Sequence, residues 1–306
     1  MSTILDEPWA EGLQIRFVLE EILDRRRSEH QELIIAQTET YGRALFIDDL
    51  LQSTEADEAM YHEPLVHPAM IIHGAARRVL VGGAGEGASL RELLRHPTVE
   101  EVLAVDLDPT IVEACREHLP SWSDGAFEDP RVTLRIEDVQ ATLARDSEPY
   151  DVVLLDVTDP VEDGPAVDLF TVRFFERVAA RLHDDGIVVL QSGELDPYDL
   201  GFARTVQTTL RQVFPWTLPM VIHVPSFHCI WSITLAGKRA HDPVPADLED
   251  RVARLPAERL RAYSAGIHRA LVTAPPWVER GLAVPGTVLS GEDERRLVTF
   301  RKDEGP

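Results

Sequence analysis

The chain has 306 residues, 44% hydrophobic and 27% charged, so it can bury a full core as one large domain or one domain with an appendage. Acidic residues outnumber basic ones 53 to 30, and the formal charge of −23 argues against a nucleic-acid or anionic-membrane partner. A cationic ligand would suit this charge, although solubility alone explains the acidity of many proteins.

Two cysteines, Cys115 and Cys229, cannot form a disulfide framework and lack the paired spacing of a zinc site. We therefore expect both to be small buried residues. The first residues, MSTILDEPWAEG, contain neither a basic start nor an apolar run, and no segment is long enough to span a bilayer. These features predict a cytoplasmic protein.

The first predicted elements are short strands. Residues 13 to 52 alternate apolar and polar positions in three runs, LQIRFVLEEIL, ELIIAQTET and RALFIDD, which break at Tyr41-Gly42 and Asp48-Asp49. This pattern is typical of β-hairpins. From Glu55 to His67 the spacing becomes helical.

Apolar strands then alternate with amphipathic helices. The strands are RRVLVGG, EVLAVDLD, RVTLRIED, YDVVLLDV and GIVVLQSG, and the helices between them include SLRELLRH, IVEACREHL and FFERVAARL. This alternation predicts βαβ units in a doubly wound, mostly parallel α/β sheet, with ligands at the carboxyl ends of the strands. Residues 203 to 213 predict another helix, and MVIHVPSFHCIWSITLAG predicts a final hairpin interrupted at Pro225.

A glycine-rich turn, GGAGEG at residues 82 to 87, follows the first of these strands. Gly83 and Gly85 would let the backbone approach a ligand closely, although a tight turn that only packs a helix on a sheet is an alternative. The next strand ends at Asp106, about 20 residues later, where an acid commonly binds ribose hydroxyls. A third strand ends at Asp138, which is suited to accept a hydrogen bond from an adenine amino group. Together these residues predict a nucleoside site.

Glu86 lies inside the glycine turn. A carboxylate there would repel a pyrophosphate, so a dinucleotide is a poorer ligand than a nucleoside with a cationic tail. An S-adenosyl sulfonium compound fits this requirement.

Two further carboxylates, Asp156 and Asp159, follow the fourth strand just before Pro160. They should face the same crevice as Glu86, although Asp159 could instead cap a helix. Tyr61, His62 and Glu63 add a phenol, an imidazole and another carboxylate, without the spacing of a zinc site, so we predict no metal. For His62 a buried, hydrogen-bonded structural role is also open.

These motifs resemble the spermidine synthase family of polyamine aminopropyltransferases. The resemblance runs from about residue 9 to 285 and is carried by LLQSTEADEAMYHEPLVHPAM, RVLVGGAGEGASLRELLRHPTVEEVLAVDLD, YDVVLLDVTDP and GPAVDLFT. It implies a Rossmann-like, class I methyltransferase-like domain after a small N-terminal antiparallel β domain. We place the N-terminal β-hairpin domain at residues 1–65, the catalytic domain at 66–290 and a polar tail at 291–306.

The resemblance also implies roles for individual residues. Asp156 would be the catalytic aspartate. The amine would contact His62, Glu86 and Asp159, with Tyr61 and Phe227 as walls of the cleft. The donor, or its product methylthioadenosine, would contact the glycine turn at Gly83 and Gly85 and the residues Gln31, Asp106, Asp138, Val139 and Pro165. No cofactor is implied beyond decarboxylated S-adenosylmethionine as co-substrate, and the family is dimeric or tetrameric.

The amine acceptor stays open. Most diamine-specific members have Asp where Glu86 stands and Gly where Ala84 stands, and the loop DPVEDGP is two residues longer than usual. These features, and the run WSDGAFEDPR, resemble the thermospermine synthase and agmatine aminopropyltransferase branch. In contrast, AGIHRALVTAP resembles ordinary spermidine synthases. Putrescine, agmatine and spermidine are all open as acceptors.

Two rival functions share part of this pattern. A methyltransferase would have the same sheet, Asp106 and Asp138, but it has no need of Asp156 and Asp159 beside Glu86. The other rival is a non-catalytic nucleoside- or polyamine-binding protein; intact Asp156 argues against it, and measurable turnover would settle the question.

Overall fold

The computed structural model of the chain describes residues 3–10, 12–160 and 166–291. Its N-terminal part is an antiparallel sheet of five strands in the order β1-β2-β3-β4-β5. The strands are β1 (Thr3–Ala10), β2 (Leu13–Arg27), β3 (Glu32–Thr38), β4 (Gly42–Ile47) and β5 (Leu50–Thr54). The hairpin prediction for residues 13 to 52 is confirmed. The sequence reading missed β1, which contains Pro8 and is an edge strand, where a proline costs no ladder hydrogen bond.

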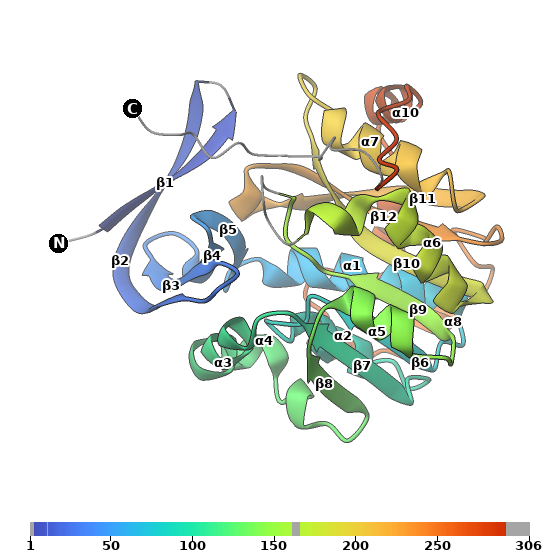
Figure 1. Ribbon diagram of the computed structural model, residues 1–306, viewed down its shortest axis with the longest axis horizontal. Coiled ribbons are helices and arrows are strands. Elements are labelled where there is room, and N and C mark those ends of the chain that lie inside the picture. Colours follow the sequence, from blue (N-terminus) through green and yellow to red (C-terminus); the bar gives the residue numbers. More distant parts are fainter. Residues whose placement is uncertain (1–2, 11, 161–165, 292–306) are drawn as a thin grey trace.

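Helix α1 (Glu58–His73) connects the two sheets and runs through the middle of the molecule (Figure 1). The sequence predicts this helix over 55 to 67, but it continues past Pro64 and Pro68 and ends at Gly74, whose φ is 81°. Of its 16 residues, 14 are buried, so packing on both sides holds the helix together despite the two prolines.

The second sheet has seven strands in the order β11-β12-β10-β9-β6-β7-β8. The strands are β6 (Arg78–Gly82), β7 (Glu101–Asp106), β8 (Val132–Ile136), β9 (Tyr150–Leu155), β10 (Leu182–Leu195), β11 (Trp216–Val224) and β12 (Cys229–Gly237). Strands β6 to β10 are parallel to one another, and β12 pairs antiparallel with both β10 and β11. The predicted doubly wound sheet and final hairpin are therefore confirmed.

Helices cover both faces of this sheet (Figure 1). They are α2 (Ala88–Leu94), α3 (Pro109–His118), α4 (Pro120–Ser123), α5 (Val139–Arg145), α6 (Val172–Arg181), α7 (Gly201–Leu210), α8 (Leu248–Val252), α9 (Ala265–Leu271) and α10 (Pro276–Leu282). Alternate residues of one strand enter different cores, since Val79 and Val81 pack with α1 and α2 while Leu80 packs with α5, α6 and α7. Residues 292–306, which include nearly all of the predicted tail, lie outside the described part.

The N-terminal sheet packs against the first helices of the catalytic part. Leu33, Ile35 and Leu45 share a buried cluster with Cys115 of α3 and Trp122 of α4. Both cysteines are free and buried, as predicted. This packing holds the N-terminal sheet over the carboxyl ends of β6, β7 and β9, where the sequence places its site residues.

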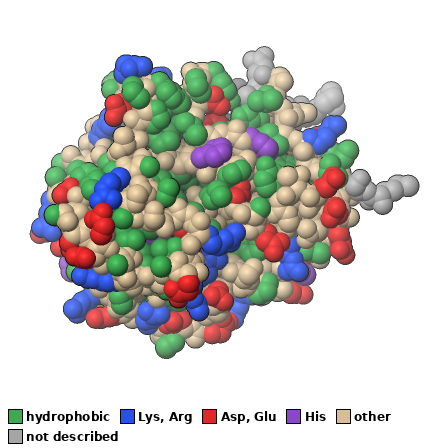
Figure 2. Space-filling view, turned by 180° about the vertical axis from the view of Figure 1, so that it is seen from behind, with side chains coloured by type: hydrophobic (Ala, Val, Ile, Leu, Met, Phe, Trp, Pro, Cys, Tyr) green, Lys and Arg blue, Asp and Glu red, His purple; other side chains and the backbone are tan. Residues whose placement is uncertain are grey.

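The surface carries charges of both signs. On the face shown in Figure 2, basic side chains stand among acidic and hydrophobic ones, so the acidic excess does not form one patch there. Most of the acids that the sequence singles out line a cavity inside the molecule, described below.

Candidate active site

A cavity of about 430 Å³ lies between the N-terminal sheet and the carboxyl ends of β6, β7 and β9, within the usual size range of ligand pockets. It is lined by every predicted site residue that the structure describes, namely Gln31, Tyr61, His62, Gly83, Gly85, Glu86, Asp106, Asp138, Val139, Asp156, Asp159 and Phe227. Pro165 lies outside the described residues. The structure thus brings together residues from distant segments, while their roles stay predictions.

The glycine turn brings the backbone close to the cavity. Gly83 has a φ of 82°, and a Cβ at this position would overlap the main-chain oxygen of Asp156. A Cβ at Gly85 would overlap Ile111 and approach a carboxylate oxygen of Asp106. A side chain is therefore excluded at both positions, because the end of β9 and the start of α3 come so close.

Asp106 ends β7, and its Oδ1 accepts a hydrogen bond from the main-chain nitrogen of Asp108 at 2.9 Å. Burial raises the pKa of Asp106 to about 6 despite that bond. Asp108 caps α3 and accepts hydrogen bonds from Ser28 at 2.6 Å and from Gln31 at 3.1 Å. Gln31 is thereby held at the end of the cavity near Asp106 by a carboxylate that the sequence reading did not single out.

Asp138 lies between β8 and α5, and it has a structural role besides its predicted contact with a ligand. It is exposed, and its Oδ1 caps α5 by accepting from the main-chain nitrogen of Gln140 at 2.8 Å. Its neighbour Val139 is buried and lines the same cavity. A capped helix start and a ligand contact are compatible, because the second carboxylate oxygen stays available.

Asp156 follows β9 and is held by two donors. The Tyr61 hydroxyl donates to Oδ1 at 2.9 Å, and the Ser89 hydroxyl donates to Oδ2 at 2.7 Å. Desolvation and the negative charge of Asp156 raise the pKa of Tyr61 well above its usual value, so the phenol stays a donor. The carboxylate of Asp156 is oriented before any ligand arrives.

Glu86 is held by a chain of hydrogen bonds from the core. The Trp122 indole donates to the Ser53 hydroxyl at 2.9 Å, and that hydroxyl donates to Glu86 Oε2 at 2.7 Å. Burial raises the pKa of Glu86 to about 7, although His62 opposes the shift. Ser53 comes from β5, so the N-terminal sheet contributes directly to the site.

Whether Asp159 caps a helix stays a prediction, because residues 161–165 lie outside the described residues. Its Oδ1 accepts from the Gln191 side chain of β10 at 2.8 Å, and burial raises the pKa of Asp159 to about 6. Glu7 of β1 lines the same cavity, accepts from the main-chain nitrogen of Leu51 at 3.2 Å, and has its pKa raised to about 7 by burial. Burial disfavours the ionised forms of these carboxylates in the empty cavity, and a cationic group bound beside them would stabilise those forms.

His62 is buried and lies between two of these acids. Its Nε2 is 3.8 Å from Glu86 Oε2 and 3.8 Å from Asp156 Oδ2. Burial alone lowers the pKa of His62, but its contact with Glu58 and the charges of Glu86 and Asp156 outweigh burial and raise the pKa to about 9. His62 is thus buried and hydrogen-bonded and also lines the cavity, while its contact with an amine stays a prediction.

Aromatic side chains close one wall of the cavity. The Phe227 ring lies 5.9 Å from the Tyr61 ring and 5.2 Å from the Trp231 ring, measured between centroids. All three line the cavity. Such a wall suits the methylene groups of an extended aliphatic ligand, and the faces of its rings can attract an ammonium group.

Sequence reasoning named Glu63, which the structure places elsewhere, and it missed several residues that hold the predicted acids. Glu63 is buried away from the cavity, where it accepts hydrogen bonds from the main-chain nitrogens of residues 261 to 263. Ser53, Ser89 and Gln191 hold three of the predicted acids, yet single hydroxyl and amide residues carry no pattern in the sequence. Glu7 was missed because β1 was missed. Among the described residues, the one three-ligand group close enough to hold a metal is Asp24, Glu117 and His118, which is outside the cavity.

The fold and the site define a class: a Rossmann-like enzyme that binds a nucleoside beside a cleft lined with carboxylates for a cationic substrate. Comparison with known families gives the narrower identity. Residues 58–244 match the spermine/spermidine synthase domain, and residues 5–55 match the spermidine synthase tetramerisation domain. The chain therefore belongs to the spermine/spermidine synthase family.

Individual relatives agree with this assignment. A polyamine aminopropyltransferase of Synechococcus sp. is 42% identical over 228 residues, which cover 73% of each chain. The crystal structure of spermidine synthase from Thermotoga maritima superimposes with a TM-score of 0.83 at 28% identity, over 92% of this chain and 94% of that one. A spermidine synthase in complex with the transition state analogue AdoDATO superimposes with a TM-score of 0.82 at 27% identity, over 92% of this chain and 94% of that one.

The described residues include no helix that is long and apolar enough to cross a membrane.

Proposed function

We propose that this chain is a polyamine aminopropyltransferase, which moves the aminopropyl group of decarboxylated S-adenosylmethionine to an amine and releases 5'-methylthioadenosine and a proton. The observation that carries the proposal is the placement of Glu86, Asp156 and Asp159 in one cavity with the nucleoside acid Asp106. Its relatives carry the name polyamine aminopropyltransferase, and the family membership is shown. The co-substrate is decarboxylated S-adenosylmethionine.

The chemistry is a direct displacement. The acceptor nitrogen forms a bond to the terminal aminopropyl carbon while the bond from that carbon to sulfur breaks, and the sulfonium leaves as a neutral thioether. A sulfonium is a good leaving group, so the main task is to align a neutral nitrogen with the carbon. The nitrogen becomes positive as it bonds and must then lose a proton.

We assign the proton transfer and alignment to Asp156. Tyr61 and Ser89 fix both of its oxygens, so it can accept a hydrogen bond from the attacking nitrogen in a defined direction. A carboxylate is a poor base toward a free ammonium, so the nitrogen has to be desolvated or bridged by a water before the proton leaves. Asp159, His62 and the aromatic wall of Tyr61 and Phe227 would hold the rest of the acceptor.

We assign the donor side to Glu86 and the nucleoside residues. Glu86 would bind the ammonium of the aminopropyl group and repel the α-carboxylate of ordinary S-adenosylmethionine, so the decarboxylated donor is favoured. Asp106 would bind the ribose and Asp138 the adenine. The remaining proposed donor contacts are Gln31, Gly83, Gly85, Val139 and Pro165, the last of which lies outside the described residues.

Several properties of the whole protein complete the proposal. The match of residues 5–55 to a tetramerisation domain supports a homo-oligomer built through the N-terminal sheet, where Ile4, Leu13 and Ile22 are exposed. We propose a cytoplasmic location. The division at residues 1–65, 66–290 and 291–306 stays a prediction; the N-terminal sheet ends at Thr54.

A panel of acceptors tests the function. Purified protein is incubated with decarboxylated S-adenosylmethionine and with putrescine, cadaverine, agmatine, spermidine or no amine, and methylthioadenosine and products are quantified by mass spectrometry. Methylthioadenosine formed only with an amine supports the transferase, and the best amine names the acceptor. Transfer of a methyl group instead would favour a methyltransferase, and donor binding without turnover would favour a binding protein.

A further inference from the structure

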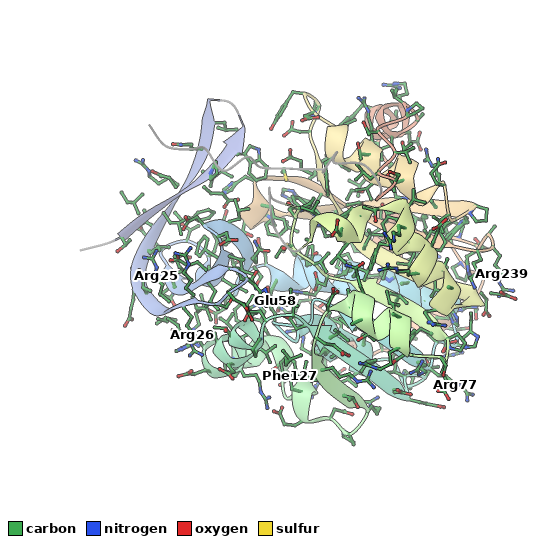
Figure 3. All side chains as sticks on the ribbon, viewed as in Figure 1. Arg25, Arg26, Glu58, Arg77, Phe127 and Arg239 are labelled. Carbon is green, nitrogen blue, oxygen red and sulfur yellow. The ribbon has the colours of Figure 1, made fainter. Side chains whose placement is uncertain are left out.

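A buried ion network continues from the active site into the protein, and the mechanism above does not use it. It begins at Glu58, the first residue of α1, which is 4% exposed. Figure 3 shows Glu58 in the middle of the molecule where β5 leads into α1, whereas Arg77 and Arg239 lie far from the N-terminal sheet. A buried carboxylate this close to a ligand cavity needs partners.

Glu58 has a partner on each oxygen. Arg91 of α2 donates to Oε2 at 2.7 Å, and Arg261 donates to Oε1 at 2.9 Å. Oε2 also lies 3.3 Å from Nδ1 of His62, one helical turn further along α1. Burial opposes its charge, but His62 and Arg91 lower the pKa of Glu58 to about 2, so it is a fixed anion.

The orientation of the His62 ring follows from this contact. Nδ1 lies 2.9 Å from the main-chain oxygen of Glu58 as well as close to its carboxylate. Both of these groups are acceptors, so Nδ1 must carry a proton. The other ring nitrogen, Nε2, is then the only position at which His62 gains or loses its charge, and it points at Glu86 and Asp156.

We propose that Glu58 is a positioning residue that fixes His62 as an imidazolium in the acceptor cleft, and that this cation keeps the attacking amine nitrogen in its neutral form. The proposal rests on the proposed function, because it concerns the acceptor of that reaction. It adds Glu58, Arg91 and Arg261, none of which lines the cavity, to the groups that control the nucleophile.

The charges around His62 support a cation at this place. From α1 it faces Glu58 and the edge of the neutral Tyr61 ring, from the glycine turn Glu86, and from the end of β9 Asp156. Arg91 and Arg261 reach it only through Glu58. The anions in direct contact therefore outnumber the cations, which favours a proton on Nε2.

The cation matters because an acceptor amine in water is almost entirely an ammonium ion. An ammonium beside Asp156 would be bound tightly but could not attack the aminopropyl carbon. An imidazolium within reach of the same carboxylate disfavours a second positive charge there, so it lowers the pKa of the bound amine and raises the share of free nucleophile. The more distant ammonium groups of the acceptor can still pair with Asp159 and Glu7.

Glu58→Gln is the direct test, and the measurement is the pH dependence of kcat/KM. Without the Glu58 charge, and with Arg91 and Arg261 left beside it, His62 should lose its proton at lower pH. We expect the alkaline fall of kcat/KM to move to lower pH by about one unit, which is a loss of about fivefold at the midpoint pH of the wild type. The acceptor's own ionisation is common to both proteins and cancels in the comparison. Glu58→Asp should restore part of the shift.

Glu92→Gln is the matched control. Glu92 is fully buried on α2, accepts from Arg91 Nε at 2.7 Å and lies 3.1 Å from His67, so its loss also breaks a buried ion pair beside a histidine. It has no contact with His62 in the described network. We expect Glu92→Gln to lower the stability of the protein without shifting the pH at which kcat/KM falls on the alkaline side. An equal shift in both variants would reduce Glu58 to a structural role and overturn the proposal.

A second measurement uses the wild-type protein, so it does not depend on whether a Glu58 variant folds. Nitrogen-15 NMR of the wild-type imidazoles, with the His62 signals assigned from their absence in His62→Asn, reports its pKa and its tautomer. We expect a cation at pH 7 and an Nδ1–H tautomer above the transition. A neutral His62 at pH 7, or an Nε2–H tautomer, would contradict the proposal. If no amine yields methylthioadenosine, the proposed function fails separately, while this NMR result still describes His62.

Discussion

The hydroxyl of Tyr61 donates a hydrogen bond of 2.9 Å to Oδ1 of Asp156, across 95 positions of sequence. Tyr61 comes from the first turns of α1 and Asp156 from the end of β9, so this bond joins the helix that leaves the N-terminal sheet to the edge of the large sheet. Together with Ser89 it leaves Asp156 one orientation, toward the cavity. Orientation is the main contribution this site can make to a displacement with a good leaving group.

Tyr61→Phe should therefore reduce kcat with little change in donor binding. We expect a loss of about tenfold, because a misplaced catalytic group commonly costs one to two orders of magnitude. Steady-state kinetics and a donor Kd measured by calorimetry check this. The matched control is Tyr150→Phe, which removes a similar 2.6 Å bond to Asp146 outside the cavity, and it should leave kcat unchanged.

Glu86→Gln should weaken the selection of the donor. The amide keeps the size of the side chain and loses the charge that would repel an α-carboxylate. We expect weaker binding of decarboxylated S-adenosylmethionine and unchanged or tighter binding of S-adenosylmethionine, measured as two Kd values. An unchanged ratio of the two constants would show that Glu86 does not select the donor.

The stability of the ligand-free protein should rise as pH falls from 9 to 7. His62 has a folded pKa of about 9, above its unfolded value, so its contribution is fully present below the unfolded pKa and is lost as pH rises through 9. Burial also raises the pKa of Glu86 to about 7, so the folded state takes up a proton there before the unfolded state does. Thermal unfolding across this range checks the sign.

A saturating polyamine should remove most of that slope, since bound ammonium groups stabilise the ionised acids of the cavity. A Tm that instead rises with pH from 7 to 9 in the ligand-free protein would contradict the assigned protonation states.

Gly83→Ala should destabilise the fold severely. Its φ of 82° is unfavourable for alanine, and the new methyl group would overlap the backbone of Asp156, which cannot rotate away. We expect a loss of more than about 2 kcal/mol in urea unfolding. Gly125→Ala has a similar φ of 80° with open space around it, so it should cost about 1 kcal/mol. Equal losses would mean that the close approach at Gly83 does not matter.

The sequence predicts most of the large sheet because each strand is a short apolar run with a helix after it, and strand ends then place Asp106, Asp138 and Asp156 at one edge. It does not predict β1, where Pro8 and charged residues hide the alternation, nor the last turns of α1 beyond Pro68. Those elements are fixed by what they pack against, and local sequence does not carry that information.

The same limit applies inside the site. Carboxylates at strand ends are visible in the sequence, but Ser53 and Gln191, which hold Glu86 and Asp159, are single polar residues on strands. Glu58 precedes His62 by one helical turn, so their contact could be inferred, whereas its pairing with Arg261 across 203 positions could not.

The most direct test of the account is the formation of methylthioadenosine from decarboxylated S-adenosylmethionine and the best amine by wild-type protein and by Asp156→Asn, at equal donor saturation. We predict amine-dependent turnover in the wild type and a loss of at least about a hundredfold in kcat for the variant, with donor binding retained. Full activity in Asp156→Asn would remove Asp156 from the catalytic role. No methylthioadenosine from the wild type with any amine, despite demonstrated donor binding, would contradict the assignment of aminopropyl transfer.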